Sequence, residues 1–192
     1  DNLHVAQKGS HAWSISARGF NTDSANKLLV LRDGRTVYTP LFSGVFWDVQ
    51  DYLLEDIDRI EVISGPGGTL WGANAVNGVI NIISKSAKDT QGSYAEVGGG
   101  SEMRGFVGAR YGGTLSSNVF FRVYGKFFDR DDSVLPTGKD AHDAWRFGQT
   151  GFRIDAEPST MNLLTLQGDF YGGDEDVSTG GDSQVAGGNL LG

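Results

Sequence analysis

Cysteine is absent from the 192-residue sequence, which excludes disulfide bonds, thiolate zinc sites and cysteine nucleophiles. No run of 18 apolar residues occurs, so a membrane-spanning helix is excluded. The first ten residues lack the regions of a signal peptide, and any secretion signal is expected upstream of Asp1. Lys and Arg number 16 against 24 Asp and Glu, a net charge of −8 that argues against nucleic acid as a partner.

Side chains for catalysis or metal binding are equally scarce. His4, His11 and His142 are scattered, and no Gly-x-Ser-x-Gly elbow occurs. The acidic run Asp174–Asp176 fails the EF-hand template at its glycine and final glutamate positions. We interpret this run as a solvated acidic loop, with calcium binding as the alternative. The sequence therefore predicts no enzyme, no cofactor and no metal site.

Glycine, by contrast, is abundant. Its 29 residues are about twice the usual share and too scattered for collagen. Such a composition is typical of β proteins with many tight turns.

The densest glycine segment lies in IDRIEVISGPGGTLWGANAVNGVINIIS, residues 57–84, between two β-branched runs. A Walker loop is excluded because Gly72 is followed by Ala73 and Asn74 instead of Lys and Ser or Thr. The dinucleotide fingerprint fails as well, since Leu70 stands where its third glycine belongs. No clear amphipathic helix follows to present its N-terminus to a phosphate.

Up to about Lys88 the pattern predicts a small α+β unit. KLLVLRDGRTVY is expected to form a hairpin around Asp33-Gly34. Val49, Tyr52 and Leu53 are spaced for one face of a short helix. The apolar runs at residues 60–63 and 79–83 predict strands that are covered on both faces.

From Ser93 onward the sequence alternates strictly. In NVFFRVYGKFFDR one face is apolar and the other carries the charge, and MNLLTLQGDFY repeats the scheme. These segments of about 10 to 13 residues exceed the usual soluble strand of about 5 or 6 and suit strands that cross a bilayer. A soluble β-sandwich with one solvated face is the alternative.

The spacers alternate in length too. GGTLSSN and EPST are short, whereas residues 131–144 and the tail 172–192 are long, polar and partly acidic. Outer-membrane barrels have short periplasmic turns and long outer loops, so the alternation predicts an orientation.

Three ordered motifs resemble a known family. ARGFN (17–21), LLVLRDGRTV (28–37) and the glycine segment (57–84) are similar, in order and spacing, to the plug domain of TonB-dependent outer-membrane transporters. Asn77, where glycine is commoner, is a mild departure. The resemblance implies a plug domain over residues 1–90, with its N-terminal part upstream, and about the first five strands of a 22-stranded transmembrane β-barrel over residues 91–192, truncated here.

The resemblance assigns a structural role to one group of residues and implies that Arg18, Arg59 and Glu61 pair with each other or with the inner barrel wall. Solvated surface charges are the alternative. The structural group is Arg18, Gly19, Asp33, Gly34, Arg59, Glu61, Gly65, Pro66, Gly72, Gly78 and Asn81, and glycines 67 and 68 share the role.

Ligand contacts are expected from two apical plug loops, at residues 20–26 and 39–47. They offer hydrogen-bonding groups and flat apolar rings. The alternative for Phe46 and Trp47 is that they anchor the following helix to the plug core. The candidates are Phe20, Asn21, Thr22, Asp23, Ser24, Asn26, Phe42, Ser43, Phe46 and Trp47.

As a function, the resemblance implies active uptake of a scarce nutrient, such as a ferric siderophore or cobalamin, across the outer membrane of a Gram-negative bacterium. TonB is the implied partner, through a segment upstream of Asp1, and outer-membrane lipid would surround the strands. The alternative is a soluble or surface-attached binding module with a plug-like domain beside a β-sandwich.

Overall fold

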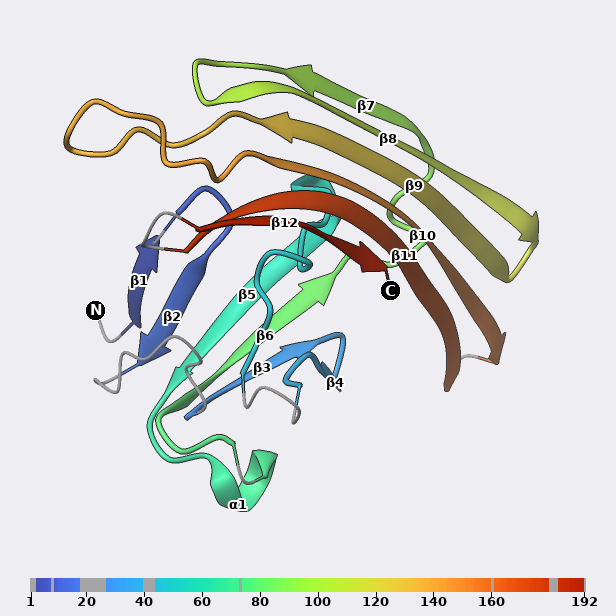
Figure 1. Ribbon diagram of the computed structural model, residues 1–192. Coiled ribbons are helices and arrows are strands. Elements are labelled where there is room, and N and C mark those ends of the chain that lie inside the picture. Colours follow the sequence, from blue (N-terminus) through green and yellow to red (C-terminus); the bar gives the residue numbers. More distant parts are fainter. Residues whose placement is uncertain are drawn as a thin grey trace. The chain divides into compact units, whose positions relative to one another are not determined.

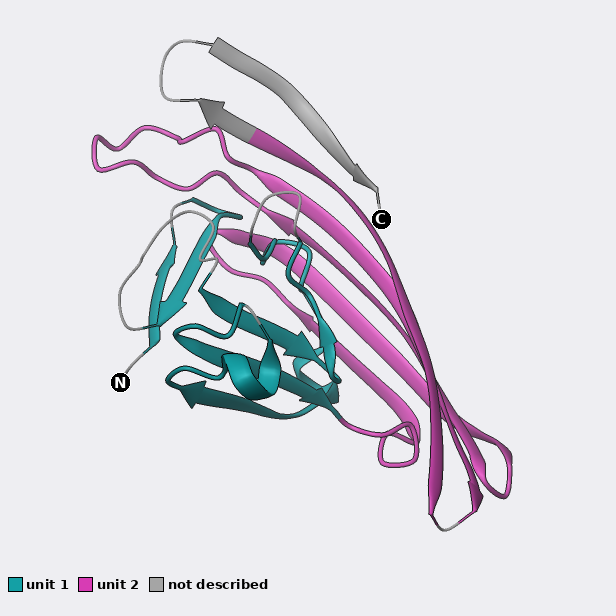
Figure 2. Ribbon diagram, turned by 90° about the horizontal axis from the view of Figure 1, so that it is seen from below, with its two compact units in different colours: residues 1–84 teal, residues 85–192 magenta. Residues whose placement is uncertain are grey.

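Both parts of the chain are built almost entirely from strands (Figure 1). The computed structural model describes residues 3–7, 9–17, 27–39, 44–72, 74–159, 161–179 and 183–191. The chain divides after Ser84 into two compact units, here called unit 1 (residues 1–84) and unit 2 (residues 85–192) (Figure 2). Among the described residues, no helix has the length and apolar character needed to cross a membrane.

The hairpin predicted around Asp33-Gly34 is confirmed. β3 (Leu28–Arg32) and β4 (Arg35–Thr36) pair in antiparallel fashion. Both turn residues have positive φ, 47° at Asp33 and 80° at Gly34, as a two-residue type I′ turn requires.

β3 belongs to a four-stranded sheet with the order β4-β3-β6-β5. β6 (Gly78–Ser84) runs parallel to β3 and antiparallel to β5 (Ile57–Ser64). A separate pair of strands, β1 (Leu3–Gln7) and β2 (Trp13–Ala17), precedes this sheet in the sequence.

The core of unit 1 lies on both faces of β3 and β6. One buried cluster contains Leu28, Val30 and Ile80, and a second contains Leu29, Leu31 and Val79. The prediction that the apolar runs are covered on both faces is therefore confirmed for Val79 and Ile80.

For β5 the same prediction is wrong. Ile60, Val62 and Ile63 are all exposed, and Ile60 keeps 55% of its accessible surface. β5 is an edge strand of its sheet, and the two buried clusters of unit 1 lie around β3 and β6 and contain no residue of β5. A β-branched run identifies a strand but not its position within the sheet.

The helix predicted from Val49, Tyr52 and Leu53 is also wrong. Residues 47–50 form a turn, and only a 3₁₀ turn, η1 (Leu54–Asp56), follows. The apolar side chains are held by separate tertiary contacts: Leu53 is 1% exposed, and the Tyr52 ring centroid lies 3.5 Å from the Arg32 guanidinium carbon. One α-helical turn, α1 (Gly68–Trp71), occurs instead inside the glycine segment.

Unit 2 forms one antiparallel sheet in the order β12-β11-β10-β9-β8-β7. Six strands stand where about five were expected. Their bounds are β7 (Gly92–Gly98), β8 (Met103–Ser116), β9 (Val119–Arg130), β10 (Trp145–Ser159), β11 (Asn162–Thr179) and β12 (Ser183–Leu191).

The tail, predicted to be a long polar loop, is mostly strand. β11 continues to Thr179, and β12 pairs with it from Gly172↔Leu191 to Thr179↔Ser183. Strand pairing needs only backbone N–H and C=O groups, so a segment of polar composition can form a strand without an apolar pattern that would predict it.

The connections of unit 2 differ in length at the two ends of the sheet. Residues 117–118 join β8 to β9, whereas residues 131–144 join β9 to β10. The long loop is organised by its own acids, since the Asp143 carboxylate accepts the Ser133 N–H at 2.7 Å and the Ser133 hydroxyl at 2.6 Å. The predicted contrast of a short and a long connection is confirmed here.

Candidate functional site

The sheet of unit 2 exposes its apolar face and buries its polar one. On β9, Val123 and Phe127 are 46% and 48% exposed, whereas Arg122 and Tyr124 are only 4% and 8% exposed. The predicted alternation of β9 is thus confirmed. The exposed, apolar face of the sheet is here called the outer face, and the buried, polar face is called the inner face.

Neighbouring strands extend this outer apolar face. Cross-strand register places Val107 opposite Phe127 and Tyr111 opposite Val123. On β11, three more exposed apolar side chains lie on the same face, namely Leu164, Leu166 and Phe170. A contiguous exposed apolar surface of this kind marks contact with another apolar phase or partner.

Charged side chains end the apolar face at the strand ends that meet the long loop 131–144. The Asp129 carboxylate lies 3.6 Å from Nη1 of Arg104 and 3.3 Å from Nε of Arg146. Asp129 follows Phe127 on the same face of β9, and Arg146 is its cross-strand partner. Along β9 the outer face therefore changes from apolar at Phe127 to charged at Asp129.

The inner face carries a polar network. The Gln149 amide donates a hydrogen bond to the Tyr124 oxygen at 2.7 Å, and the Tyr124 hydroxyl donates to Asp169 at 2.6 Å. Gln149 is 4% exposed. Burial of these groups is sustained by their mutual hydrogen bonds.

A cluster of aromatic side chains on the inner face was not predicted from the sequence. The ring centroids of Phe128 and Trp145 are 4.5 Å apart in an edge-on arrangement, and Phe147 stacks on Tyr171 at 5.8 Å. Trp145 and Phe147 occupy alternate positions of β10, which would have placed them on one face. Their meeting with Phe128 depends on cross-strand register.

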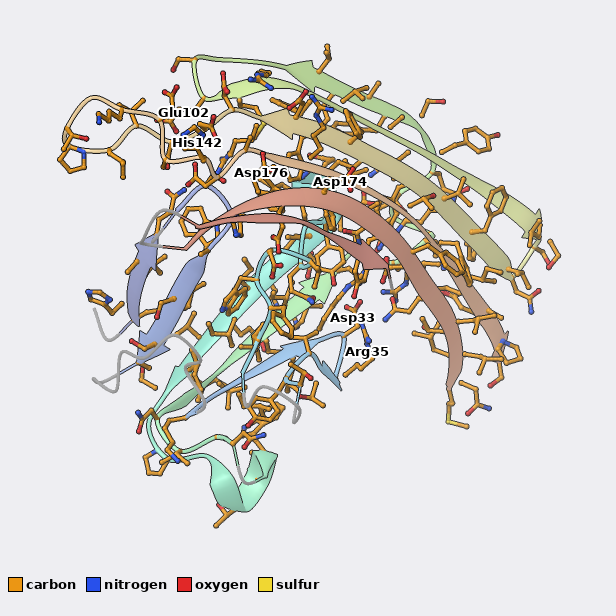
Figure 3. All side chains as sticks on the ribbon, in the orientation of Figure 1. Asp33, Arg35, Glu102, His142, Asp174 and Asp176 are labelled. Carbon is orange, nitrogen blue, oxygen red and sulfur yellow. The ribbon has the colours of Figure 1, made fainter. Side chains whose placement is uncertain are left out.

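The acidic run Asp174–Asp176 lies within β11, so its assignment to a loop is wrong. Asp174 faces Arg146 and Glu175 faces Trp145 across the strand pair. Figure 3 labels Asp174 and Asp176 together with Glu102 and His142 of the same unit. No group of three or more His, Asp or Glu side chains that could hold a metal ion occurs in the part of the chain that the structure describes.

In unit 1 the glycine segment is held together by hydrogen bonds between its own backbone groups. The N–H of Gly65 donates to Asn77 O at 3.1 Å, and the N–H of Gly67 donates to Ala75 O at 2.8 Å. Trp71 and Gly72 donate to carbonyls of the same segment. Because these N–H groups are engaged internally, they are not available to cradle a phosphate.

Three glycines of this segment are required by geometry. Gly65 and Gly72 have φ angles of 117° and 98°, which L side chains rarely adopt. At Gly78 a Cβ atom would lie 2.6 Å from the carbonyl oxygen of Ile63. Pro66 follows Gly65 in the loop, and Gly72 is the C-terminal cap of α1.

A ladder of polar contacts crosses from β5 to β6. Arg59 Nε lies 2.8 Å from Glu61 Oε1, and Arg59 Nη1 lies 2.7 Å from Asp58. The Asn81 amide donates to the other Glu61 oxygen at 3.1 Å. Hydrogen bonds from Arg59 and then Asn81 lower the pKa of Glu61, and the Glu61 and Asp58 carboxylates raise the pKa of Arg59. Arg18 and Gly19 lie outside the described residues.

Asp33 connects the hairpin turn, labelled with Arg35 in Figure 3, to the end of β6. Its two carboxylate oxygens accept the N–H and the hydroxyl of Ser84, both at 2.8 Å. The turn residue therefore also holds the last residue of unit 1.

Most predicted ligand residues lie outside the described residues, namely Phe20, Asn21, Thr22, Asp23, Ser24, Asn26, Phe42 and Ser43. Trp47 packs against the core cluster of Leu28, Val30 and Ile80. Phe46 is 43% exposed. Beside them, burial raises the pKa of the Asp48 carboxyl, although hydrogen bonds from the backbone of Asp48 and Val49 and the charge of His11 oppose the shift.

Comparison with known proteins agrees with this architecture. Residues 2–79 match the family model of the TonB-dependent Receptor Plug Domain. The vitamin B12 transporter BtuB of Vibrio vulnificus is 37% identical over 102 residues, which make up 52% of this chain and 16% of that protein. The ferric enterobactin receptor of Pseudomonas aeruginosa is 29% identical over 160 residues, 73% of this chain and 20% of that protein.

Solved structures extend the likeness to unit 2. The pyoverdine outer-membrane receptor FpvA from Pseudomonas aeruginosa PAO1, bound to pyoverdine, superimposes with a TM-score of 0.69 at 21% identity. The match covers 91% of this chain and 24% of that one, so it includes the strands of unit 2 and shows a common fold.

The chain belongs to the TonB-dependent receptors, with a plug domain at residues 2–79 followed by strands similar to those of the receptor barrels. This family resides in the outer membrane of Gram-negative bacteria, which is the localisation of the protein. The chain spans 16% and 20% of the length of the two curated relatives.

Proposed function

We propose that this chain is part of a transporter that takes up a scarce nutrient across the outer membrane, and that it is not an enzyme. Residues 1–90 would form the plug, and residues 91–192 the first strands of a closed, 22-stranded transmembrane barrel around it. The observation that carries the proposal is the inverted sheet of unit 2. Strands of 12 to 18 residues, from β8 to β11, expose apolar side chains on the outside.

Lipid accounts for this pattern better than water does. The apolar outer face of unit 2 ends at the charged row of Asp129, Arg104 and Arg146, as a surface does where hydrocarbon meets the polar interface. A soluble β-sandwich would require a second sheet on that face. In the described residues of unit 2 all the strands belong to one sheet.

The ligand class is a ferric siderophore, cobalamin or a molecule of similar size. The relatives are a vitamin B12 transporter and a ferric enterobactin receptor, and the structural neighbour is a receptor bound to pyoverdine. In this chain the ligand would meet the apical plug loops at residues 20–26 and 39–47. Phe46, which is partly exposed, is a better candidate contact than Trp47, which packs into the core.

Energy for uptake would come from the inner-membrane proton gradient through TonB, which would bind a segment upstream of Asp1. The plug would then rearrange and open a path through the barrel. The residues proposed to keep the plug architecture intact are the glycine segment, the Arg59–Glu61–Asn81 ladder and the Asp33–Ser84 contact.

An uptake assay tests the proposal. The gene that encodes this sequence is deleted in its host and restored on a plasmid, and uptake of labelled cobalamin, ferric enterobactin and ferric pyoverdine is measured. We expect uptake of at least one of these to be lost and restored with the gene, and to stop when TonB is removed. Uptake that continues without TonB would contradict the proposal.

A further inference from the structure

The segment between the two units is unusually well held. Residues 85–91, here called the junction segment, belong to unit 2 and contain no strand or helix apart from turns. Nevertheless Ala87 is 0% exposed and Thr90 is 1% exposed. Connecting segments usually lie on the surface and make few contacts.

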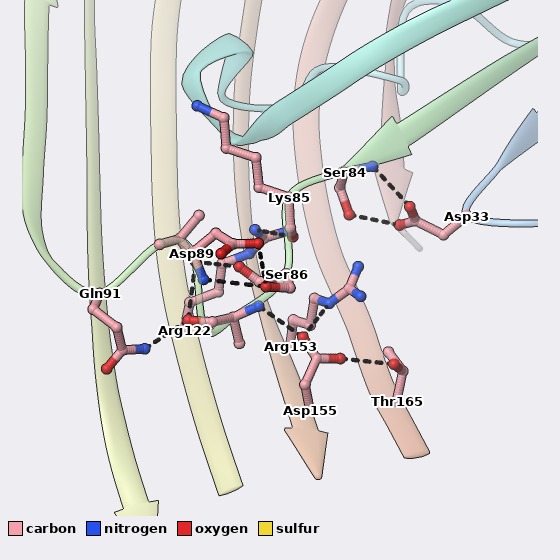
Figure 4. A network of polar contacts seen from close by, with 12 residues as sticks. Asp33, Ser84, Lys85, Ser86, Asp89, Gln91, Arg122, Arg153, Asp155 and Thr165 are labelled. Atoms are coloured by element: carbon pink, nitrogen blue, oxygen red, sulfur yellow. Dashed lines mark hydrogen bonds and ion pairs between the residues drawn. The ribbon is translucent and has the colours of Figure 1, made fainter. Parts of the chain in front are cut away.

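Strands β9 and β10 hold the junction segment directly (Figure 4). Arg122 Nη1 donates a hydrogen bond to the Lys85 carbonyl at 2.7 Å, and the Ala87 N–H donates to Asp155 Oδ2 at 2.7 Å. Arg122 and Asp155 are 4% and 2% exposed. Both contacts therefore lie where water competes little, which strengthens charge-assisted hydrogen bonds.

Asp155 is itself fixed by neighbouring strands. Its Oδ2 also accepts the Arg153 Nε–H at 2.8 Å, and its Oδ1 accepts the Thr165 hydroxyl at 2.7 Å. Donors thus reach one carboxylate from the junction segment, from β10 and from β11. This carboxylate cannot follow the junction segment if that segment is pulled away.

The junction segment is also braced internally. The Thr90 hydroxyl donates to Ser86 O at 2.9 Å, and the Gln91 amide donates to Ala87 O at 2.6 Å. These bonds close a compact turn immediately before β7 begins at Gly92. The Lys88–Glu157 ion pair is exposed and adds little.

The residue before the junction segment is held in a different way. Ser84 is bonded to Asp33 within unit 1, whereas Lys85 and Ala87 are bonded within unit 2. Hydrogen bonds within unit 1 therefore hold the chain up to Ser84, and hydrogen bonds within unit 2 hold it from Lys85 onward.

We propose that the junction segment is an anchor, so that displacement or unfolding of unit 1 ends at Ser84 and does not spread into residues 85–91. Asp155 is its central positioning residue and Arg122 supports it. The role of the anchor in uptake rests on the proposed transport function, whereas the anchor itself is a property of unit 2.

Single-molecule force measurement tests the anchor. The complete receptor that contains this sequence is held in a bilayer and pulled from a handle at Asp1. Release of residues 1–84 should lengthen the chain by at most ~300 Å before extension stops. In Asp155→Ala the seven residues of the junction segment should follow, adding about 25 Å.

Two further variants make the force result specific. Asp155→Asn keeps an oxygen that can accept the Ala87 N–H, so it should stop at the wild-type length. Asp131→Ala removes an exposed ion pair with Arg104 away from the segment and should also behave as wild type. An Asp155→Ala receptor that stops at the wild-type length, or a wild-type receptor that releases past residue 84 in the same event, would overturn the proposal.

Amide hydrogen exchange separates loss of the anchor from loss of the fold. In Asp155→Ala the Ala87 amide should exchange at least tenfold faster, while the amides of β9 keep their protection. Equal exchange at Ala87 in both proteins would contradict the anchor. If the uptake assay fails while the ~300 Å stop persists, the transport function falls and the anchor stands.

Discussion

At Gly78 the backbone of β6 lies close to the backbone of β5. A Cβ atom there would meet the Ile63 carbonyl oxygen at 2.6 Å, and backbone cannot yield as a flexible side chain can. We expect Gly78→Ala to destabilise unit 1 by about 2 kcal/mol, as overpacking does. Faster amide exchange in β3 and β6 would report it.

Gly68→Ala is the matched control for this change. Gly68 lies in α1, and a Cβ atom there would meet nothing within 4 Å. Because alanine favours helix over glycine, exchange in β3 and β6 should stay the same or slow slightly. A Gly78→Ala protein that exchanges as slowly as the Gly68→Ala protein would show that β5 and β6 are not so close.

Asp48 makes the stability of unit 1 depend on pH. Burial raises the pKa of this carboxyl in the folded state, so the folded state retains its proton to a higher pH than the unfolded state does. The stabilisation from the protonated form is complete below the unfolded pKa of about 4 and is lost as the pH rises through the folded pKa.

Asp48→Asn removes this titration. Relative to the wild type, the variant should therefore gain stability between pH 3.5 and pH 7. Urea unfolding of unit 1 in the receptor, followed by exchange of β3 amides at both pH values, measures the difference. A variant whose relative stability falls as the pH rises would contradict the assignment.

At the scale of elements, the inverted pattern of β9 can be tested with one charge. Val123 lies on the outer apolar face near the middle of the strand. We expect Val123→Lys to cost about 2–4 kcal/mol in the free energy of unfolding in lipid vesicles, since a charge would enter hydrocarbon.

Leu115→Lys provides the control, because Leu115 is also exposed, at 64% against 46% for Val123, but lies close to the end of β8. Lysine near the membrane interface costs about 0–1 kcal/mol. Equal, small effects at both positions in urea titrations would indicate that the face meets water.

The link between the hairpin and β6 offers another test. Asp33→Ala removes both hydrogen bonds to Ser84 and places alanine at a φ of 47°. We expect a loss of about 2 kcal/mol and rapid exchange of the Ser84 amide. Asp33→Asn, which tolerates this φ and keeps one acceptor, should lose less, and equal losses would count against the contact.

For β9 and the β3–β4 hairpin, strand identity was predictable from the sequence, but the position of a strand within its sheet was not. The period of two on β9 and the turn residues Asp33-Gly34 are local signals, and the structure confirms both. That β5 lies at a sheet edge depends on which strands pair with it, and a β-branched run carries no such information. The supposed helix near Tyr52 failed for the same reason, because its apolar residues are fixed by distant partners such as Arg32.

The candidate site shows the same division. Glycine positions 65 and 78 could be predicted, since the demands of a tight loop on backbone and space are local. The anchoring of Ala87 by Asp155 could not, because the two residues are 68 positions apart and meet only through strand register. An acid within an alternating strand gives no sign of which backbone group it will hold.

In the whole molecule, the two units differ in which side chains they bury. Unit 1 buries apolar side chains around β3 and β6, as a protein in water does. Unit 2 exposes them on one face and keeps its polar network on the other. That combination follows if the strands of unit 2 form part of a wall between lipid and a polar interior.

Single cysteines placed along β9 test this central claim most directly, because the sequence contains no cysteine of its own. Each position from Val119 to Phe128 is labelled in turn with a fluorophore in the receptor reconstituted in vesicles, and quenching by brominated lipids is recorded. The account predicts strong quenching at residues 119, 121, 123 and 127 and weak quenching at residues 120, 122, 124 and 126. Uniform quenching by a water-soluble agent at both sets of positions would contradict it.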